Sequence, residues 1–196
     1  MTSRYTSRMS TIVSSGAGFT IEDLEGLPSD GNRYELIEGT LHVTPAPRFA
    51  HQRAVGNLFH VLRQACPPEL EVVLGPFDVQ LGPDTMVEPD LLVTRPDDPT
   101  EKRLEQPPLL AIEVLSPSTR LYDLGTKRLA YEQFGVPAYW VVDVLDPAAA
   151  RIIEWRWAPS GVAEPTERTV EGDAAFTTEY PFPVTVVPGR LPLLGG

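Results

Sequence analysis

Hydrophobic and polar positions follow a helical period in one long stretch of the chain. Val55, Leu58, Phe59 and Leu62 recur at the spacing i, i+3, i+4 and i+7, which predicts an amphipathic helix over residues 50–66. Two prolines follow at once and end this helix. The chain therefore holds at least one helix that packs a single apolar face on a core.

A second pattern predicts strands joined by a helix. Residues 89–94 form a short apolar run, and residues 109–115 are nearly all apolar, as expected for a strand buried on both faces. A helix is predicted over about 122–134, ending at Gly135, and another apolar strand over 138–144. The order strand, helix, strand predicts a parallel crossover unit.

Shorter signals complete the expected fold. Thr20 is a helix N-cap candidate, and two β-prone runs flank Glu38–Gly39 as in a hairpin. Residues 71–81 indicate a strand pair or a bent strand, while 151–157 and 168–187 indicate terminal antiparallel strands. We therefore expect an α/β fold: a mixed central sheet flanked by helices, with additional C-terminal antiparallel strands.

The length of 196 residues suits one domain with a sizeable core. Residues 1–18 are rich in Ser and Thr without an apolar signal segment, and we expect a disordered leader there. Residues 19–146 would form the core and residues 147–196 a β extension packed on it. No apolar run is long enough to span a membrane. Cys66 is the one cysteine, which excludes an internal disulfide, and we expect a cytoplasmic protein.

The net charge of −11 argues against strong, non-specific binding of nucleic acid, which normally requires a basic face. Affinity for DNA would have to come from a local basic strip, an oligomer or a partner. Arg48, Arg53 and Arg120 are candidates for such a strip, or they are ordinary solvated charges. Part of the negative charge could belong to a cation site.

Glu113 lies in the middle of an apolar strand, where an ionised carboxylate is costly to bury without a partner. Asp90 lies early in another predicted strand. If these strands are neighbours, both carboxylates can face one point, where they repel each other unless a proton or cation intervenes. Mg²⁺ or Mn²⁺ meets that need with oxygen ligands and supports phosphodiester hydrolysis.

Lys127 is the candidate third member of this site. Asp123 and Lys127 are four residues apart and share one face of the helix that follows the Glu113 strand. A lysine there could stabilise charge that develops on a phosphate, or orient the attacking water.

Each of these residues also has an ordinary explanation. Glu113 could cap a turn or pair with an arginine, Asp90 could be a turn residue, and Lys127 could be a solvated helix lysine. Glu35 or Glu38 could be a polar hairpin residue rather than part of the site. Other residues are expected to have ordinary roles: His51 to cap a helix or face phosphate more readily than to act as a general base, Cys66 to fill the core, and Trp140, Trp155 and Trp157 to lie in the core or an interface.

Five motifs in order give a specific resemblance: Tyr34–Gly39, Pro89–Val93, Glu113–Ser118, Asp123 with Lys127, and Tyr131–Asp143. Over about residues 19–146 the chain resembles the Uma-two family of restriction-endonuclease-like proteins in the PD-(D/E)XK nuclease superfamily. The resemblance implies that Asp90 and Glu113 are metal-binding carboxylates and that the backbone carbonyl of Val114 is a further ligand. It also implies that Glu35 is an additional acidic residue and Lys127 the catalytic lysine.

The chain departs from the wider superfamily at the position of the lysine. The usual lysine lies two residues after the glutamate, and that position is Leu115 here. The resembled family has the same arrangement, with the lysine on the following helix. The site is complete only if that helix turns Lys127 inward.

Together these patterns predict a Mg²⁺- or Mn²⁺-dependent endonuclease that acts on DNA. Two alternatives stay open: a nuclease-like fold used as a binding or regulatory module, and a hydrolase of another phosphodiester such as RNA or a small nucleotide. Double-strand cleavage by one small domain generally needs two active sites, so we expect a homodimer. Its candidate contacts are the apolar residues Ile152, Ile153, Trp155 and Trp157.

Overall fold

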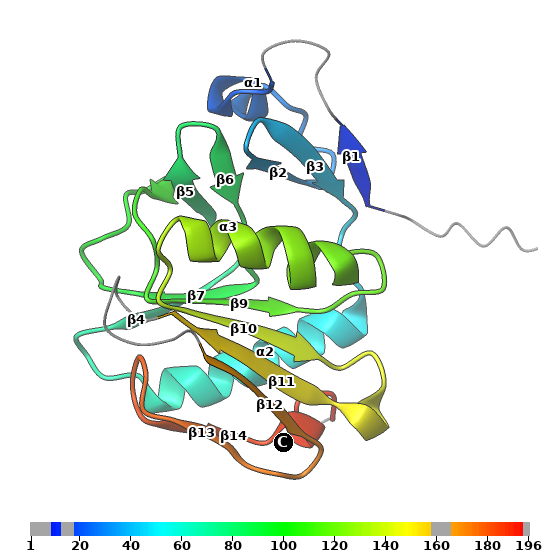
Figure 1. The fold of residues 1–196 in the computed structure, drawn as a ribbon, viewed down its shortest axis with the longest axis vertical. Helices are drawn as coiled ribbons and strands as arrows, with labels where there is room; N and C mark the ends of the chain where they lie inside the picture. Colours follow the sequence, from blue (N-terminus) through cyan, green and yellow to red (C-terminus); the bar gives the residue numbers. More distant parts are fainter. Residues whose placement is uncertain (1–8, 13–17, 158–165, 194–196) are drawn as a thin grey trace, which may run out of the picture.

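The computed structural model describes residues 9–12, 18–157 and 166–193, which form two main sheets with helices between and beside them (Figure 1). We call the first of these sheets sheet A. Its strand order is β1 (Ser10–Ile12), β3 (Thr40–Thr44), β2 (Arg33–Ile37), β6 (Thr85–Val87), β5 (Asp78–Gly82) and β8 (Arg103–Leu104).

We call the second main sheet sheet B, and it is the one that carries the predicted crossover. Its strand order is β12 (Thr166–Glu171), β11 (Arg151–Arg156), β10 (Ala138–Asp143), β9 (Leu110–Val114), β7 (Leu91–Thr94) and β4 (Glu71–Leu74). A separate hairpin is formed by β13 (Phe176–Thr178) and β14 (Val184–Val186).

The longest helix, α2 (Phe49–Ala65), packs on one face of sheet B, and the β13–β14 hairpin lies on the same side (Figure 1). A π-helical segment, η1 (Tyr122–Lys127), continues into α3 (Arg128–Gln133), and together they cover the opposite face. The remaining short helices are α1 (Ile21–Glu25), η2 (Pro147–Ala149) and η3 (Pro188–Arg190).

Both faces of sheet B are buried at its central strands β7, β9 and β10, where successive residues alternate between the two faces. In β9, Leu110, Ile112 and Val114 pack on the α2 side, whereas Ala111 and the following Leu115 pack on the α3 side. Glu113 falls between the last two positions by this alternation, so it faces α3 and sheet A. The near-continuous apolar run 109–115 is explained by this double burial.

The pairing of β9 with its two neighbours confirms the expected topology. It runs parallel to β10, with Val141 opposite Glu113, so η1 and α3 form the predicted crossover. It runs antiparallel to β7, with Leu91 opposite Ile112. One further step in this register brings Asp90 opposite Glu113, which is the proximity that the sequence required of these two strands.

Several local predictions are also confirmed. Thr20 caps α1 in a reciprocal hydrogen-bonded arrangement with Asp23. The hairpin of β2 and β3 turns at Glu38 and Gly39, whose φ angles of 48° and 72° are the positive values that a tight two-residue turn needs. Helix α2 ends at Ala65, directly before Cys66 and the two prolines.

The expected α/β fold class is confirmed, and its strands are divided between two mixed sheets, A and B. Two other expectations need correction. The expected disordered leader over residues 1–18 is wrong at Ser10–Ile12, which pair with β3; residues 1–8 and 13–17 lie outside the described residues. The proposed dimer contacts include Ile152 and Trp155, which are buried within the chain itself because they pack into the clusters on the α2 side and the α3 side of sheet B, respectively.

Of the predicted C-terminal extension, strands β11 and β12 continue sheet B, since β11 pairs with β10 along its length and β12 pairs with β11. Trp140 is fully buried, as expected of a core residue. Cys66 is partly buried against the same core. Within the described ranges, no helix has the length and apolar character needed to cross a membrane.

Gly75 fixes the backbone next to Asp90, and we expect Gly75→Ala to destabilise the protein. Its N–H donates to the carbonyl oxygen of Asp90 (2.9 Å), and an added Cβ would collide with the carbonyl oxygen of Pro89. Overpacking against backbone should lower the free energy of unfolding by about 1–3 kcal/mol, measured by chemical denaturation.

Gly56→Ala is the matched control, because Gly56 lies within α2 and a Cβ there meets no atom within 4 Å. It should raise the free energy of unfolding by about 0.5–1 kcal/mol through helix propensity. A free energy of unfolding for Gly75→Ala that is no lower than that of the wild type would contradict the predicted overpacking.

Candidate active site

Asp90 is held in a fixed position at the start of β7. Its Oδ2 accepts a hydrogen bond from the backbone N–H of Val114 (2.9 Å), which ties β7 to the end of β9. Arg33 Nη1 lies 2.8 Å from Oδ1, and His51 Nε2 lies 2.9 Å from Oδ2. The predicted carboxylate is therefore buried, and its two oxygens have defined partners on β2, β9 and α2.

Lys127 turns inward, as the sequence analysis required. It lies at the last position of the π-helical segment η1, and its side chain is 2% exposed. Wide helical turns of this kind are frequent at functional sites. Asp123, at the second position of η1, is also buried, so these two residues do share the inner face of the helix.

The Lys127 ammonium group joins two carboxylates that come from different sheets. Its Nζ lies 2.7 Å from Glu113 Oε1 on β9 and 2.6 Å from Glu35 Oε1 on β2. Tyr131 donates a further hydrogen bond to Glu113 Oε1 (3.2 Å). The structure thus brings together Glu35, Glu113 and Lys127. Asp90 lies opposite Glu113, at the position next to the last β7–β9 pair.

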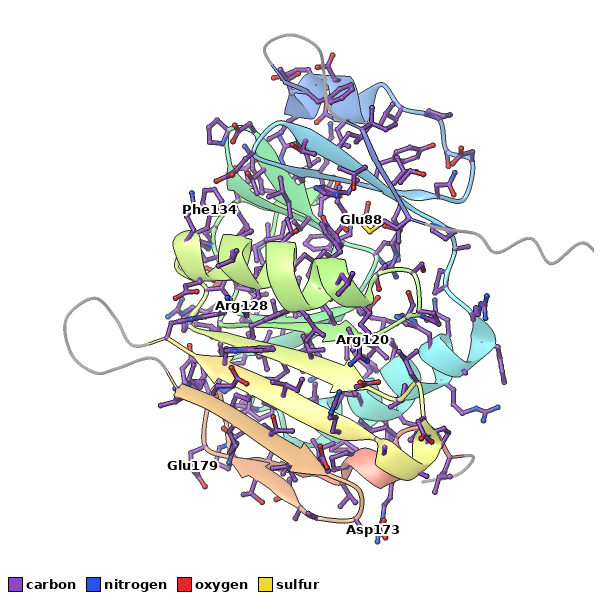
Figure 2. The ribbon with its side chains drawn as sticks, turned by 45° about the vertical axis from the view of Figure 1, so that its right-hand side comes forward. Glu88, Arg120, Arg128, Phe134, Asp173 and Glu179 are labelled. Carbon is purple, nitrogen blue, oxygen red and sulfur yellow. The ribbon has the colours of Figure 1, made fainter. Side chains whose placement is uncertain are left out.

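Glu35 is held from its other side by the chain that leads into β7. The backbone N–H of Glu88 donates to Glu35 Oε1 (2.7 Å). Figure 2 shows Glu88 and Arg120 on opposite sides of the helix formed by η1 and α3. Arg120 pairs with Asp143 (2.8 Å), so its charge is already engaged at the far side of this helix.

These side chains line a cavity of about 630 Å³ at the C-terminal ends of β9 and β10. Such an edge is a common place for ligands in open α/β sheets. The cavity reaches from the site residues to the start of α2 and to the turn after β9. Its lining includes Arg33, Glu35, Arg48, His51, Asp90, Glu113, Val114, Ser116, Thr119, Asp123 and Lys127.

Three carboxylates, from Glu35, Glu113 and Asp123, surround the Lys127 ammonium group, so negative charge is in excess around it. Burial raises the pKa of Glu113 well above its usual value, and nearby Asp90, Asp123 and Glu35 add to the rise that Lys127 opposes. Burial likewise raises the pKa of Asp123 to about 7, against the attraction of Lys127. Burial alone would lower the pKa of Lys127, but Glu113, Glu35 and Asp123 outweigh it and raise that pKa. The ammonium group stays charged.

Asp90 has the opposite balance. Burial would raise its pKa, but the hydrogen bond and charge of His51, the charge of Arg33 and the Val114 N–H together lower the pKa to about 2. Asp90 is therefore an anion at neutral pH. Two neighbouring carboxylates with pKa values moved in opposite directions are typical of functional sites.

The donor set fits a divalent cation that keeps part of its water shell. Within residues 9–12, 18–157 and 166–193, no three His, Cys, Asp or Glu side chains are grouped as a ready metal site. Mg²⁺ is usually bound by one or two carboxylates together with water and substrate phosphate. Asp90, Glu113 and the carbonyl of Val114 could supply such a set, and the excess negative charge favours it.

Arg33 and Tyr131 also belong to this site, through their contacts with Asp90 and Glu113, and neither was predicted from the sequence. Both border motifs used there, since Arg33 precedes Tyr34 and Tyr131 opens the last motif. His51 was expected to cap a helix or face phosphate, but it pairs with Asp90 instead. No sequence signal linked His51 to a strand 39 residues away.

The three arginines predicted to form a basic strip have different surroundings. Arg48 lines the cavity, whereas Arg53 stacks over the ring of Phe49 at 4.8 Å. Arg120 is paired with Asp143, as described above.

Comparison with known proteins agrees with the fold and the sequence motifs. One solved structure that matches is described as a "putative nuclease belonging to DUF820 from Anabaena variabilis ATCC 29413". It is 20% identical, with a TM-score of 0.64, and the match covers 82% of this chain and 89% of that one. At this identity the likeness shows a shared fold.

No curated protein sequence matches the chain. The Uma2 family, described as "Putative restriction endonuclease", matches residues 21–180. This match includes every residue placed in the site and continues beyond residue 146 into the C-terminal strands. The chain belongs to the Uma2 family of restriction-endonuclease-like proteins.

Proposed function

We propose that this protein is a Mg²⁺- or Mn²⁺-dependent endonuclease that hydrolyses DNA phosphodiester bonds in the cavity described above. Asp90 and Glu113 would bind the cation with the carbonyl of Val114. Lys127 would be the catalytic lysine, and Glu35 the additional acidic residue that holds it.

The placement of Lys127 carries this proposal. A lysine is rarely buried so fully, and this one sits between Glu113 and Glu35 at the wall of a cavity, close to Asp90. Leu115, where the superfamily usually has its lysine, is buried on the same side of sheet B that Glu113 faces. The helix that covers that side can therefore supply the catalytic lysine that is missing at position 115.

The residues would divide the chemistry between them. A bound divalent cation would polarise a phosphoryl oxygen and lower the pKa of a water molecule. Lys127, kept charged by its carboxylate neighbours, would stabilise the negative charge that develops on the phosphate. Arg33, His51 and the Val114 N–H would hold Asp90 in place as an anion.

A binding or regulatory module is the second candidate, favoured by the net charge of −11. It differs from the enzyme in needing no divalent cation. A nuclease for RNA differs only in substrate, and competition between DNA and RNA strands in a cleavage assay separates it from the DNA nuclease.

Lys127→Met and Asp90→Asn should abolish nicking of supercoiled plasmid in Mn²⁺. Each keeps the approximate volume of the side chain while removing its charge. We expect the cleavage rate to fall at least about 100-fold, the scale for loss of one group that stabilises transition-state charge. Gel analysis of nicked and linear plasmid gives the rates.

Lys102→Ala is the matched control, since Lys102 is exposed and is the other lysine of the chain. It should cleave like the wild type, and circular dichroism should show that all three variants are folded. Equal nicking by the wild type, Lys127→Met and Asp90→Asn would overturn the assignment of these residues.

Calorimetric titration with Mn²⁺ should detect binding by the wild type and strongly reduced binding by Glu113→Gln. The substitution removes one of the two proposed carboxylate ligands and part of the excess negative charge, while Lys127 stays. Glu38→Gln, in the exposed hairpin turn, should bind Mn²⁺ like the wild type. A wild type that binds no divalent cation would favour the binding module instead.

A further inference from the structure

A large aromatic side chain lies in solvent at the edge of the cavity. Phe49 is the first residue of α2 and is 74% exposed. Its neighbours Arg48 and Ala50 both line the cavity. At this position the ring can be covered by a ligand that enters the cavity, and burial of its apolar surface would then favour binding.

One face of the Phe49 ring already has a partner. The Arg53 guanidinium group, one helical turn further along α2, lies 4.8 Å from the ring centroid. This cation–π contact holds the ring in place at a small energetic gain. A ring held in this way is a suitable platform on which a nucleic-acid base can stack. Such stacking does not depend on which of the four bases is present.

The depth of the site limits which form of DNA can reach it. Glu113 and Lys127 are each 2% exposed and Asp90 is 3% exposed, so the reactive groups lie at the bottom of the cavity. The volume of about 630 Å³ suits a nucleotide or two. An unpaired strand bends more freely than a duplex, and is therefore the form of DNA that can more readily bring its phosphate down to Asp90 and Glu113.

The distribution of charge leaves one cationic side chain available at the mouth of the cavity. Two of the cationic side chains at the cavity are occupied, since Arg33 pairs with Asp90 and Lys127 with Glu113. Arg48 is exposed and makes no ion pair within the described parts of the chain. Arg48 is therefore the side chain that can pair with a phosphate at the mouth. The net charge of −11 opposes the backbone of either form of DNA, so contacts to an unpaired base must supply much of the affinity.

We propose that the cavity takes a nucleotide from an unpaired DNA strand, with one base stacked on Phe49 and a neighbouring phosphate beside Arg48. The inference rests on the proposed nuclease function and names its substrate class: single-stranded DNA, or the unpaired part of a duplex. Leu145, which lines the cavity and is 40% exposed, adds apolar surface near the mouth.

Binding in metal-free buffer tests the proposal without cleavage. Fluorescence anisotropy of the full chain should be measured with a labelled oligonucleotide as a single strand, as a blunt duplex and as an abasic strand of equal length. The single strand should bind about tenfold tighter than either of the others, since only it offers an unpaired base to stack. Equal affinity for single strand and duplex would overturn the proposal.

Substitutions assign the effect to the platform. Phe49→Ala should weaken binding of the single strand by about five- to hundredfold, the range for loss of one stacked base, and leave the abasic strand unaffected. Phe49→Trp should bind at least as tightly as the wild type. Leu129→Ala, at a 54% exposed residue of α3 outside the cavity lining, should have no effect.

The remaining outcomes are also decisive. If Phe49→Ala leaves binding of the single strand unchanged but converts a dimer to a monomer in light scattering, Phe49 belongs to an interface between copies and the proposal is wrong. If binding follows the expected order while the wild type fails to nick DNA in Mn²⁺, the base platform stands and the nuclease function does not.

Discussion

The ion pairs of Lys127 with Glu113 and Glu35 are the interaction on which the rest of the site depends. They join β9 in sheet B to β2 in sheet A through a residue of the covering helix. Removing one partner of a buried pair leaves the other charge unpaired, which typically costs about 3–5 kcal/mol. The Lys127 ammonium group therefore also holds sheets A and B together beside the cavity.

This arrangement explains why a carboxylate can occur in a strand that is apolar on both sides. Glu113 faces the side of sheet B that is covered by η1 and α3, where Lys127 and Tyr131 are within hydrogen-bonding distance. Lys127 does not fully compensate this burial, because it also pairs with Glu35. Burial therefore keeps the pKa of Glu113 raised, with a further rise from the nearby charges of Asp90, Asp123 and Glu35, and a bound cation would relieve this repulsion.

Much of the fold was predictable because its signals are local. The apolar period of α2, the double burial of β9 and the turn residues Glu38 and Gly39 each follow from neighbouring positions in the sequence. The division into sheets A and B was not predictable in this way. It depends on which strands pair over long separations, such as β2 with β6, and no short-range pattern encodes that choice.

The candidate site was predictable to a similar degree. Glu113 could be predicted from its apolar surroundings, in which a carboxylate needs a partner. Lys127 was predicted almost wholly from the resemblance, since its spacing showed only that it could reach the site. Arg33 and His51 were missed as partners of Asp90 because their contacts join residues 57 and 39 positions apart. A sequence does not distinguish a solvated polar residue from a buried one. The packing of β2 and α2 near the start of β7 is what places Arg33 and His51 against Asp90.

The π-helical form of η1 sets the direction of Lys127. A π-turn holds one more residue than an α-turn. The same residues wound as a regular α-helix would therefore place those after the turn about 100° further around the helix axis relative to sheet B. Substitutions that favour a regular α-helix between Tyr122 and Lys127 would turn the lysine away from Glu113 and Glu35, even where Lys127 itself is kept.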